Sequence, residues 1–128
     1  MLKHLNPSTM APPAGRYSQL VEIPQNARWL YVAGQVGVKP DGSALEGFEA
    51  QADQAWRNLE AALKAVNMGF GDVVRLNYYL VDPAHVPAAR AVRDRFIRDP
   101  APAATLVVVK ALASPAWLFE LEAVAAKA

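Results

Sequence analysis

The segment PAATLVVV (residues 102–109) runs from a proline into the most strand-like part of the chain. The residues from Thr105 to Leu112 are mostly β-branched or aliphatic, which predicts a β-strand. Successive side chains of a strand point to opposite faces of the sheet, and here the neighbours Leu106 and Val107 are both apolar. Both faces of the sheet are therefore expected to be covered, as in a fully buried strand.

The residues on either side predict two helices and four further strands. The expected strands are Tyr17–Ile23, Arg28–Val32, Asp72–Val81 and Leu118–Ala126. The first two flank the turn Pro24–Ala27 and are expected to form a hairpin, and residues 34–38 are typical of a short strand or a bulged strand end. Apolar residues at spacings of three and four predict a helix from Phe48 that is closed by Gly69. A second helix is expected from about Val86 to Arg98.

This order, β-β-α-β-α-β-β, predicts an α+β fold in one domain over residues 1–128, with one mixed sheet and both helices on one face. Two helices can hardly cover both faces of such a sheet. A second copy of the chain is the simplest cover for the other face, so we expect an oligomer whose interface resembles a core cut in half.

The composition excludes several classes of function. The 13 Lys and Arg against 12 Asp and Glu leave a net charge of +1, which argues against nucleic acid or an anionic membrane as partner. The chain has no cysteine, which fits the cytoplasm, and we expect neither a signal peptide nor a membrane-spanning run. His4 and His85 lack metal-ligand spacing, and no nucleotide-binding glycine motif occurs, so we expect neither a metal nor a cofactor.

The last expected strand carries two carboxylates on one face. In FELEA (residues 119–123), Phe119 and Leu121 alternate with Glu120 and Glu122, so the glutamates point to the face that the helices leave open. They are either solvated edge residues, or one of them lies at a subunit boundary. In the second case partial burial would raise its pKa and let it act as an acid or base.

An ordered set of short motifs resembles the Rid family, also called the YjgF family, of enamine/imine deaminases and their relatives. The motifs are GRY (15–17), AGQ (33–35), Gln51 with Asn58 and Leu59, FGDVV (70–74), VD (81–82), PAATLVVVKAL (102–112) and FELEA (119–123). The resemblance spans nearly the whole chain. It implies a chorismate mutase-like fold and a homotrimer with clefts between subunits. A homotrimer agrees with the predicted strand Thr105–Leu112, which is apolar on both faces.

The resemblance also identifies candidate site residues. It implies that Glu120 is the tentative catalytic residue, which positions or activates water, and that Tyr17 lies at the cleft. In the deaminating members an arginine that holds the substrate carboxylate occupies the position of Ala104, next to Thr105, which we also include among the substrate-binding residues. Ala33 and Arg90 replace a serine and an asparagine of the family pattern, so these two positions also line the expected substrate site. Arg90 is the best candidate to supply a replacement cation, and its alternative is an ordinary exposed helix residue.

Three functions remain open. The favoured one is a Rid-like trimer that binds a small organic metabolite between subunits, without the usual deaminase activity because position 104 is alanine. The second is an enamine/imine deaminase or other hydrolase that acts on a substrate without a carboxylate. The third is an RNA-binding, endoribonuclease-like translation inhibitor, which requires a basic surface that the near-neutral charge does not suggest.

Overall fold

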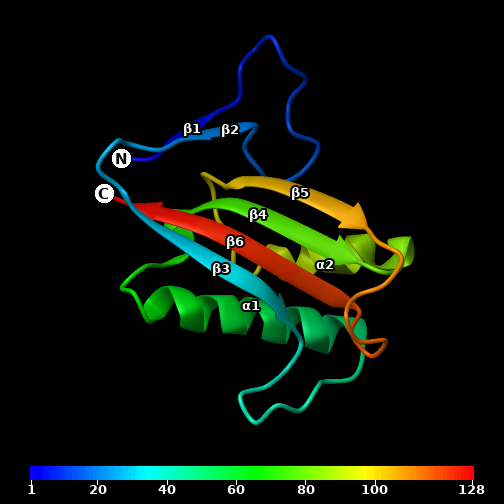
Figure 1. Cartoon of the computed structure of the whole chain (residues 1–128). Helices are drawn as coiled ribbons and strands as arrows, with labels where there is room; N and C mark the ends of the chain where they lie inside the picture. Colours follow the sequence, from blue (N-terminus) through cyan, green and yellow to red (C-terminus); the bar gives the residue numbers. More distant parts are fainter.

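The computed structural model describes all residues from 1 to 128. Its elements follow in the order β1 (Lys3–Leu5), β2 (Leu20–Glu22), β3 (Arg28–Val36), α1 (Phe48–Lys64), η1 (Phe70–Asp72), β4 (Val73–Leu80), η2 (Pro83–His85), α2 (Val86–Arg93), β5 (Ala103–Val108) and β6 (Phe119–Lys127). The predicted α+β class, with two helices and a mixed sheet, is confirmed. Both helices lie on one side of the main sheet (Figure 1).

The main sheet has the strand order β3-β6-β4-β5. Strand β6 pairs antiparallel with both of its neighbours, β3 and β4, whereas β4 and β5 are parallel. The parallel pair is joined through α2, because parallel neighbours need a crossover connection. Strand β5 is consequently an edge strand, and β6 lies inside the sheet with its register fixed on both sides.

The predicted hairpin between residues 17–23 and 28–32 is wrong. The turn itself forms, since the N–H of Ala27 donates to the carbonyl of Pro24 (3.2 Å). However, β2 pairs with β1 in a separate two-stranded sheet, and β3 pairs with β6 at the other end of the chain. The predicted bulged end is confirmed, because the β3–β6 register shifts between Val32 and Gln35.

Helix α1 packs its apolar stripe on the main sheet and ends earlier than predicted. Trp56, Leu59 and Leu63 are fully buried, as the spacing of three and four requires. The helix ends at Lys64, and in the turn that follows Asn67 has a φ of 58° and the N–H of Met68 donates to the Leu63 carbonyl (2.9 Å). The prediction that Gly69 closes the helix is therefore wrong. Asparagine tolerates the left-handed conformation well enough to replace glycine.

Two amides of α1 join the helix to the ends of neighbouring strands. The buried Gln51 donates to the carbonyls of Leu45 and Ala116 (2.9 Å each) and accepts from the Leu118 N–H (2.8 Å). Asn58 donates to the carbonyls of Val36 and Val38. Gln51 and Asn58, which are among the residues that resemble the Rid family, therefore have structural roles. Their side chains satisfy backbone hydrogen-bonding groups where β3 ends and β6 begins.

The core lies between the helices and one face of the sheet. Phe119 and Leu121 of β6 are buried, so the predicted alternation in this strand is confirmed, and β4 alternates in the same way with Leu76 and Leu80 buried. Helix α2 is shorter than the predicted range of 86–98. The chain beyond α2 still packs inward, where Phe96 stacks on Trp56 with ring centroids 5.5 Å apart.

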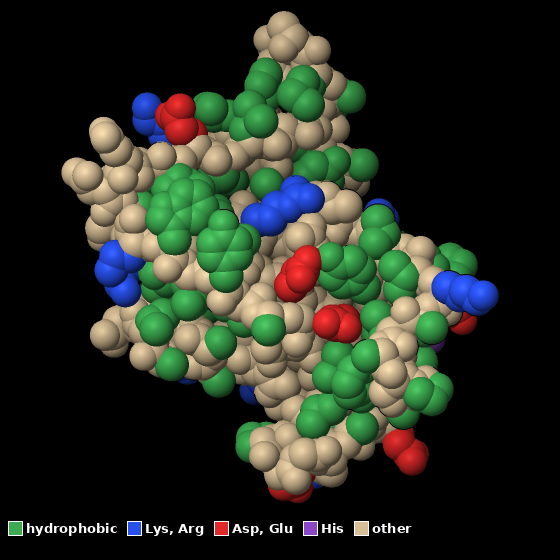
Figure 2. All heavy atoms as spheres, in the orientation of Figure 1, with side chains coloured by type: hydrophobic (Ala, Val, Ile, Leu, Met, Phe, Trp, Pro, Cys, Tyr) green, Lys and Arg blue, Asp and Glu red, His purple; other side chains and the backbone are tan.

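The opposite face of the sheet is covered by no element of this chain. Tyr31 is 76% exposed and Trp29 is 53% exposed, and Val107 on β5 is 40% exposed. Figure 2 shows large hydrophobic side chains over β3 on this face, with acidic groups over the strands beside them. We call it the open face. Neither helix has the length and apolar character needed to cross a membrane.

Candidate functional site

The two glutamates of β6 lie on the open face, but their surroundings differ. Glu122 accepts hydrogen bonds from the Tyr79 hydroxyl (2.5 Å) and from the Asn77 amide (3.2 Å). This bond to Glu122 is the main reason that the pKa of Tyr79 is raised. The Glu122 side chain is therefore held by residues of β4, whereas the Glu120 side chain makes no hydrogen bond or ion pair in the chain.

Glu120 combines partial burial with this lack of a partner. Burial raises the pKa of the Glu120 carboxyl, and the negative charge of Glu122 raises it further. Its side chain lies over Gly34 so closely that any Cβ at position 34 would collide with the carboxylate. A carboxyl group with a raised pKa can transfer protons closer to neutral pH than an ordinary glutamate can.

Glu120 borders a pocket of about 320 Å³ at the end of the open face, lined by Tyr79, Val109, Ala111, Leu112, Ala113, Glu120 and Glu122. We call it the Glu120 pocket. Its wall beyond the two glutamates and Tyr79 is aliphatic, and no cationic side chain lines it. Taken alone, it offers a substrate a carboxyl group and no anchor for an anion.

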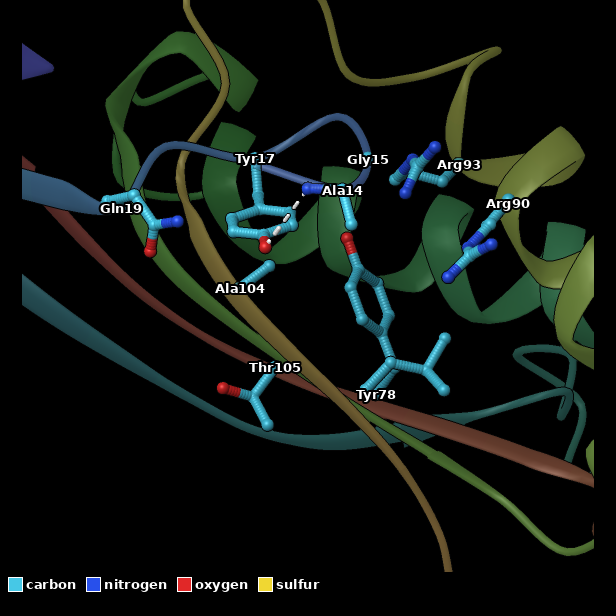
Figure 3. A pocket seen from close by; sticks show the side chains of 10 residues that line it. Ala14, Gly15, Tyr17, Gln19, Tyr78, Arg90, Arg93, Ala104 and Thr105 are labelled. Atoms are coloured by element: carbon cyan, nitrogen blue, oxygen red, sulfur yellow. Dashed lines mark hydrogen bonds between the residues drawn. The ribbon is translucent and has the colours of Figure 1, made fainter. Parts of the chain in front are cut away.

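A second pocket, of about 390 Å³, lies at the beginning of β5. It is lined by Ala14, Gly15, Tyr17, Gln19, Tyr78, Arg90, Arg93, Ala104, Thr105 and Leu106, and we call it the Tyr17 pocket. Figure 3 shows Tyr17 beside Ala104, with both arginines on the side formed by α2. Four of the predicted site residues, Tyr17, Arg90, Ala104 and Thr105, therefore meet in one place.

Ser18 fixes the loop that carries Tyr17. Its buried hydroxyl donates to the Ala101 carbonyl (2.5 Å), and its N–H donates to the Pro102 carbonyl (3.0 Å). Both acceptors directly precede β5, so the two bonds hold the loop against the entrance of the strand. Tyr17 is thereby kept next to Ala104 although the two are far apart in the sequence.

The predicted sites Ala33 and Glu120 do not belong to the Tyr17 pocket. Ala33 is exposed on β3, and Glu120 borders the other pocket. Within one chain the candidate residues thus form two groups on different parts of the molecule. No three His, Asp or Glu side chains converge as a metal site would require.

Among the lining residues of the Tyr17 pocket that sequence reasoning missed are Tyr78 and Arg93. Tyr78 lies on the inner face of β4, where it is 5% exposed, and its hydroxyl is buried without a hydrogen-bond partner. Burial raises the pKa of this hydroxyl, which therefore stays protonated. Arg93 could have been found from its position three residues after Arg90, which places both on the same side of a helix.

The four-stranded mixed sheet with both helices on one face is the α+β architecture that the resemblance to Rid proteins implies. Comparison with known sequences agrees, because the model of the family described as Endoribonuclease L-PSP matches residues 8–127. The chain belongs to this family, which is also known as the Rid or YjgF family.

Relatives in the family resemble this chain over most of its length. A RutC family protein of Aquifex aeolicus is 31% identical over 90% of this chain and 91% of its own. The 2-iminobutanoate/2-iminopropanoate deaminase of Mus musculus is 33% identical over 92% of this chain and 87% of its own. Among solved structures, the Rid-family protein YyfB of Yersinia pestis is 34% identical with a TM-score of 0.84, covering 97% of both chains.

Proposed function

We propose that this protein binds a small organic metabolite in clefts between the subunits of a homotrimer, without the deaminase activity toward 2-iminopropanoate-type substrates. The observation that carries the proposal is Ala104, which lines the Tyr17 pocket where the resemblance implies an arginine in deaminating members. A methyl group cannot hold a carboxylate. The loss of a charge-assisted hydrogen bond costs roughly 1.5–3 kcal/mol, and it also removes the orientation on which the rate depends.

The separation of the candidate residues supports a site shared between subunits. Tyr17 and Ala104 line one pocket, Glu120 lines another, and the open face beside Glu120 exposes large apolar side chains. A second copy laid on the open face would cover those side chains and add its own residues to the Glu120 pocket. A metabolite held between Tyr17 and Thr105 of one subunit would then lie close to a neighbouring subunit. The proposal places this assembly in the cytoplasm.

A second candidate function is an enamine/imine deaminase or related hydrolase for substrates that lack a carboxylate. The unpaired Glu120, with its raised pKa, supports it, because such a group could polarise water without the arginine. The near-neutral charge of the chain gives no support to RNA cleavage.

The test is an imine hydrolysis assay in which an amino acid and an oxidase generate the imine in solution. Release of keto acid and ammonia is followed with wild type, Ala104→Arg and Glu120→Ala, and with the mouse deaminase as positive control. We expect the wild type not to exceed the rate in buffer, and Ala104→Arg to bind small keto acids more tightly. Strong wild-type turnover that Glu120→Ala abolishes would show that the proposal is wrong.

A further inference from the structure

The hydroxyl of Tyr78 is a buried hydrogen-bond donor that the fold itself does not use. Tyr78 lines the Tyr17 pocket from β4, and its hydroxyl oxygen is closed off from solvent without a partner in the chain. Most buried polar groups are hydrogen-bonded, and a group that lacks a partner lowers stability. A phenylalanine would fill the same space without that cost. Packing of the core therefore gives no reason for a hydroxyl at this position.

Aromatic neighbours fix the direction of this hydroxyl. The Tyr78 ring packs against Trp56, with ring centroids 5.9 Å apart, and against Phe119, with centroids 6.4 Å apart. Both neighbours are fully buried, so the Tyr78 ring cannot turn unless the core repacks. Figure 3 shows the hydroxyl pointing toward Ala14, with Tyr17 beside it. The donor is therefore held in one orientation beneath Ala14.

The residue that covers the hydroxyl, Ala14, is weakly held. It is exposed, and its one hydrogen bond runs from its N–H to the Tyr17 hydroxyl over a long distance of 3.3 Å. Arg16 and Ser18 attach the same loop to the rest of the molecule further along the chain. A small shift of Ala14 therefore opens the Tyr78 hydroxyl to the pocket while those attachments stay in place.

We infer that the Tyr78 hydroxyl donates a hydrogen bond to an uncharged carbonyl oxygen of the metabolite in the Tyr17 pocket, and so selects ketones and amides. This inference rests on the proposed function and names a specificity-determining residue for its ligand. The hydroxyl remains a donor because burial raises its pKa. An uncharged oxygen suits this place, since a charge buried beside Trp56 and Phe119 would cost far more than a carbonyl. The arginines of the pocket, Arg90 and Arg93, approach from α2, whereas Tyr78 approaches from the sheet.

The test titrates the full chain with 2-pentanone and with butanoate, in which a charged oxygen replaces the methyl group on the carbonyl. The pocket volume of about 390 Å³ is sufficient for either molecule. The backbone amide signals of Ala104 and Thr105 in NMR spectra locate binding, and the infrared carbonyl stretch of bound 2-pentanone reports its hydrogen bond. Tyr78→Phe removes the donor. Tyr31→Phe is the matched control, because Tyr31 is 76% exposed, makes no hydrogen bond and lies outside this pocket.

We expect 2-pentanone to shift the signals of Ala104 and Thr105, and its carbonyl stretch to move to lower frequency on binding. Tyr78→Phe should weaken 2-pentanone roughly tenfold, abolish the change in frequency and raise the melting temperature of the ligand-free protein. Tyr31→Phe should match the wild type. The affinity for butanoate should not depend on Tyr78.

Equal binding of 2-pentanone by wild type and Tyr78→Phe, or no binding by the wild type, would overturn the inference and leave the proposed function standing. An equal loss of butanoate affinity in Tyr78→Phe would also overturn it, because the hydroxyl would then serve a charged oxygen. Wild-type imine turnover, in contrast, would overturn the proposed function and leave the role of Tyr78 intact.

Discussion

The carboxylate of Glu120 lies directly over the backbone of Gly34, with no space between them for a side chain at position 34. The contact joins β6 to the bulged part of β3, where the register shifts between Val32 and Gln35. Glycine at position 34 therefore lets the Glu120 side chain lie flat against the sheet. The conformation of the candidate acid-base residue depends on a residue of another strand.

Gly34→Ala should displace Glu120 more than it destabilises the fold. A new methyl group would force the carboxylate away, and a side chain pushed off its preferred rotamer costs roughly 0.5–1.5 kcal/mol. We expect a drop of that size in the free energy of unfolding, measured by urea denaturation, together with a clear change in the NMR titration of Glu120. Gly71→Ala is the control, since a Cβ there meets no atom within 4 Å. Equal titration curves for both variants and wild type would contradict the contact.

Glu120→Gln should change how stability depends on pH. The pKa of Glu120 is raised above its ordinary value of 4.5 by burial and by Glu122, so the folded state favours the protonated form. This contribution to stability is complete below pH 4.5 and is lost as the pH rises through the raised pKa. Glutamine imitates the protonated group. The variant should therefore be more stable than the wild type near neutral pH, with a flatter profile above pH 4.5.

Melting temperatures between pH 4 and pH 8 would test this expectation. Glu46→Gln is the control, because Glu46 is exposed and makes no ion pair, so its removal changes the net charge equally. If both variants show the same profile, Glu120 does not titrate as its surroundings predict.

Removing the hydroxyl from Tyr78 and from its neighbour Tyr79 should change the free energy of unfolding in opposite directions. The Tyr78 hydroxyl is buried without a partner, and such a group costs roughly 1–3 kcal/mol, so Tyr78→Phe should stabilise the protein. The Tyr79 hydroxyl donates to Glu122 (2.5 Å). Tyr79→Phe should therefore destabilise the protein by about 1 kcal/mol, because this half-exposed bond contributes less than a buried one.

The free energy of unfolding of both variants, measured side by side by chemical denaturation, distinguishes these effects from a general loss of packing. Each variant keeps its aromatic ring, so the two serve as controls for one another. Destabilisation of similar size in both would mean that the Tyr78 hydroxyl has a partner in solution.

Much of the sheet and its helices followed from local patterns. The alternation of Phe119 and Leu121 with Glu120 and Glu122 predicted the two faces of β6, and the spacing around Trp56 predicted α1. Each of these patterns depends on neighbours within a few residues. The hairpin prediction failed because the partner of β2 is β1, and the partner of β3 lies about ninety residues further along the chain. A turn at Pro24–Ala27 could not reveal either pairing.

The candidate site was also predictable only in part, because the relative positions of its residues depend on strand pairings between distant parts of the sequence. The resemblance to the Rid family identified Tyr17, Arg90 and Ala104, which meet in one pocket. It could not show that Glu120 lies apart from them, since that depends on the positions of β5 and β6 in the sheet. The unpaired hydroxyl of Tyr78 was also beyond sequence reasoning, because an inward tyrosine in a strand is usually a core residue.

The last prediction concerns assembly through the open face. Tyr31 and Trp29 are large aromatic side chains exposed at 76% and 53%, and exposed apolar patches of this kind mark interaction sites. If copies of the chain cover this face, light scattering during size exclusion should give about three times 13.8 kDa at micromolar concentration. Tyr31→Glu would place a charge in the interface at a cost of several kcal/mol, and should shift the mass toward that of the monomer with an unchanged circular dichroism spectrum. Met10→Glu is the control, because Met10 is 45% exposed but lies outside the main sheet. A wild-type monomer, or a trimer that Tyr31→Glu leaves intact, would show that the open face is not the interface.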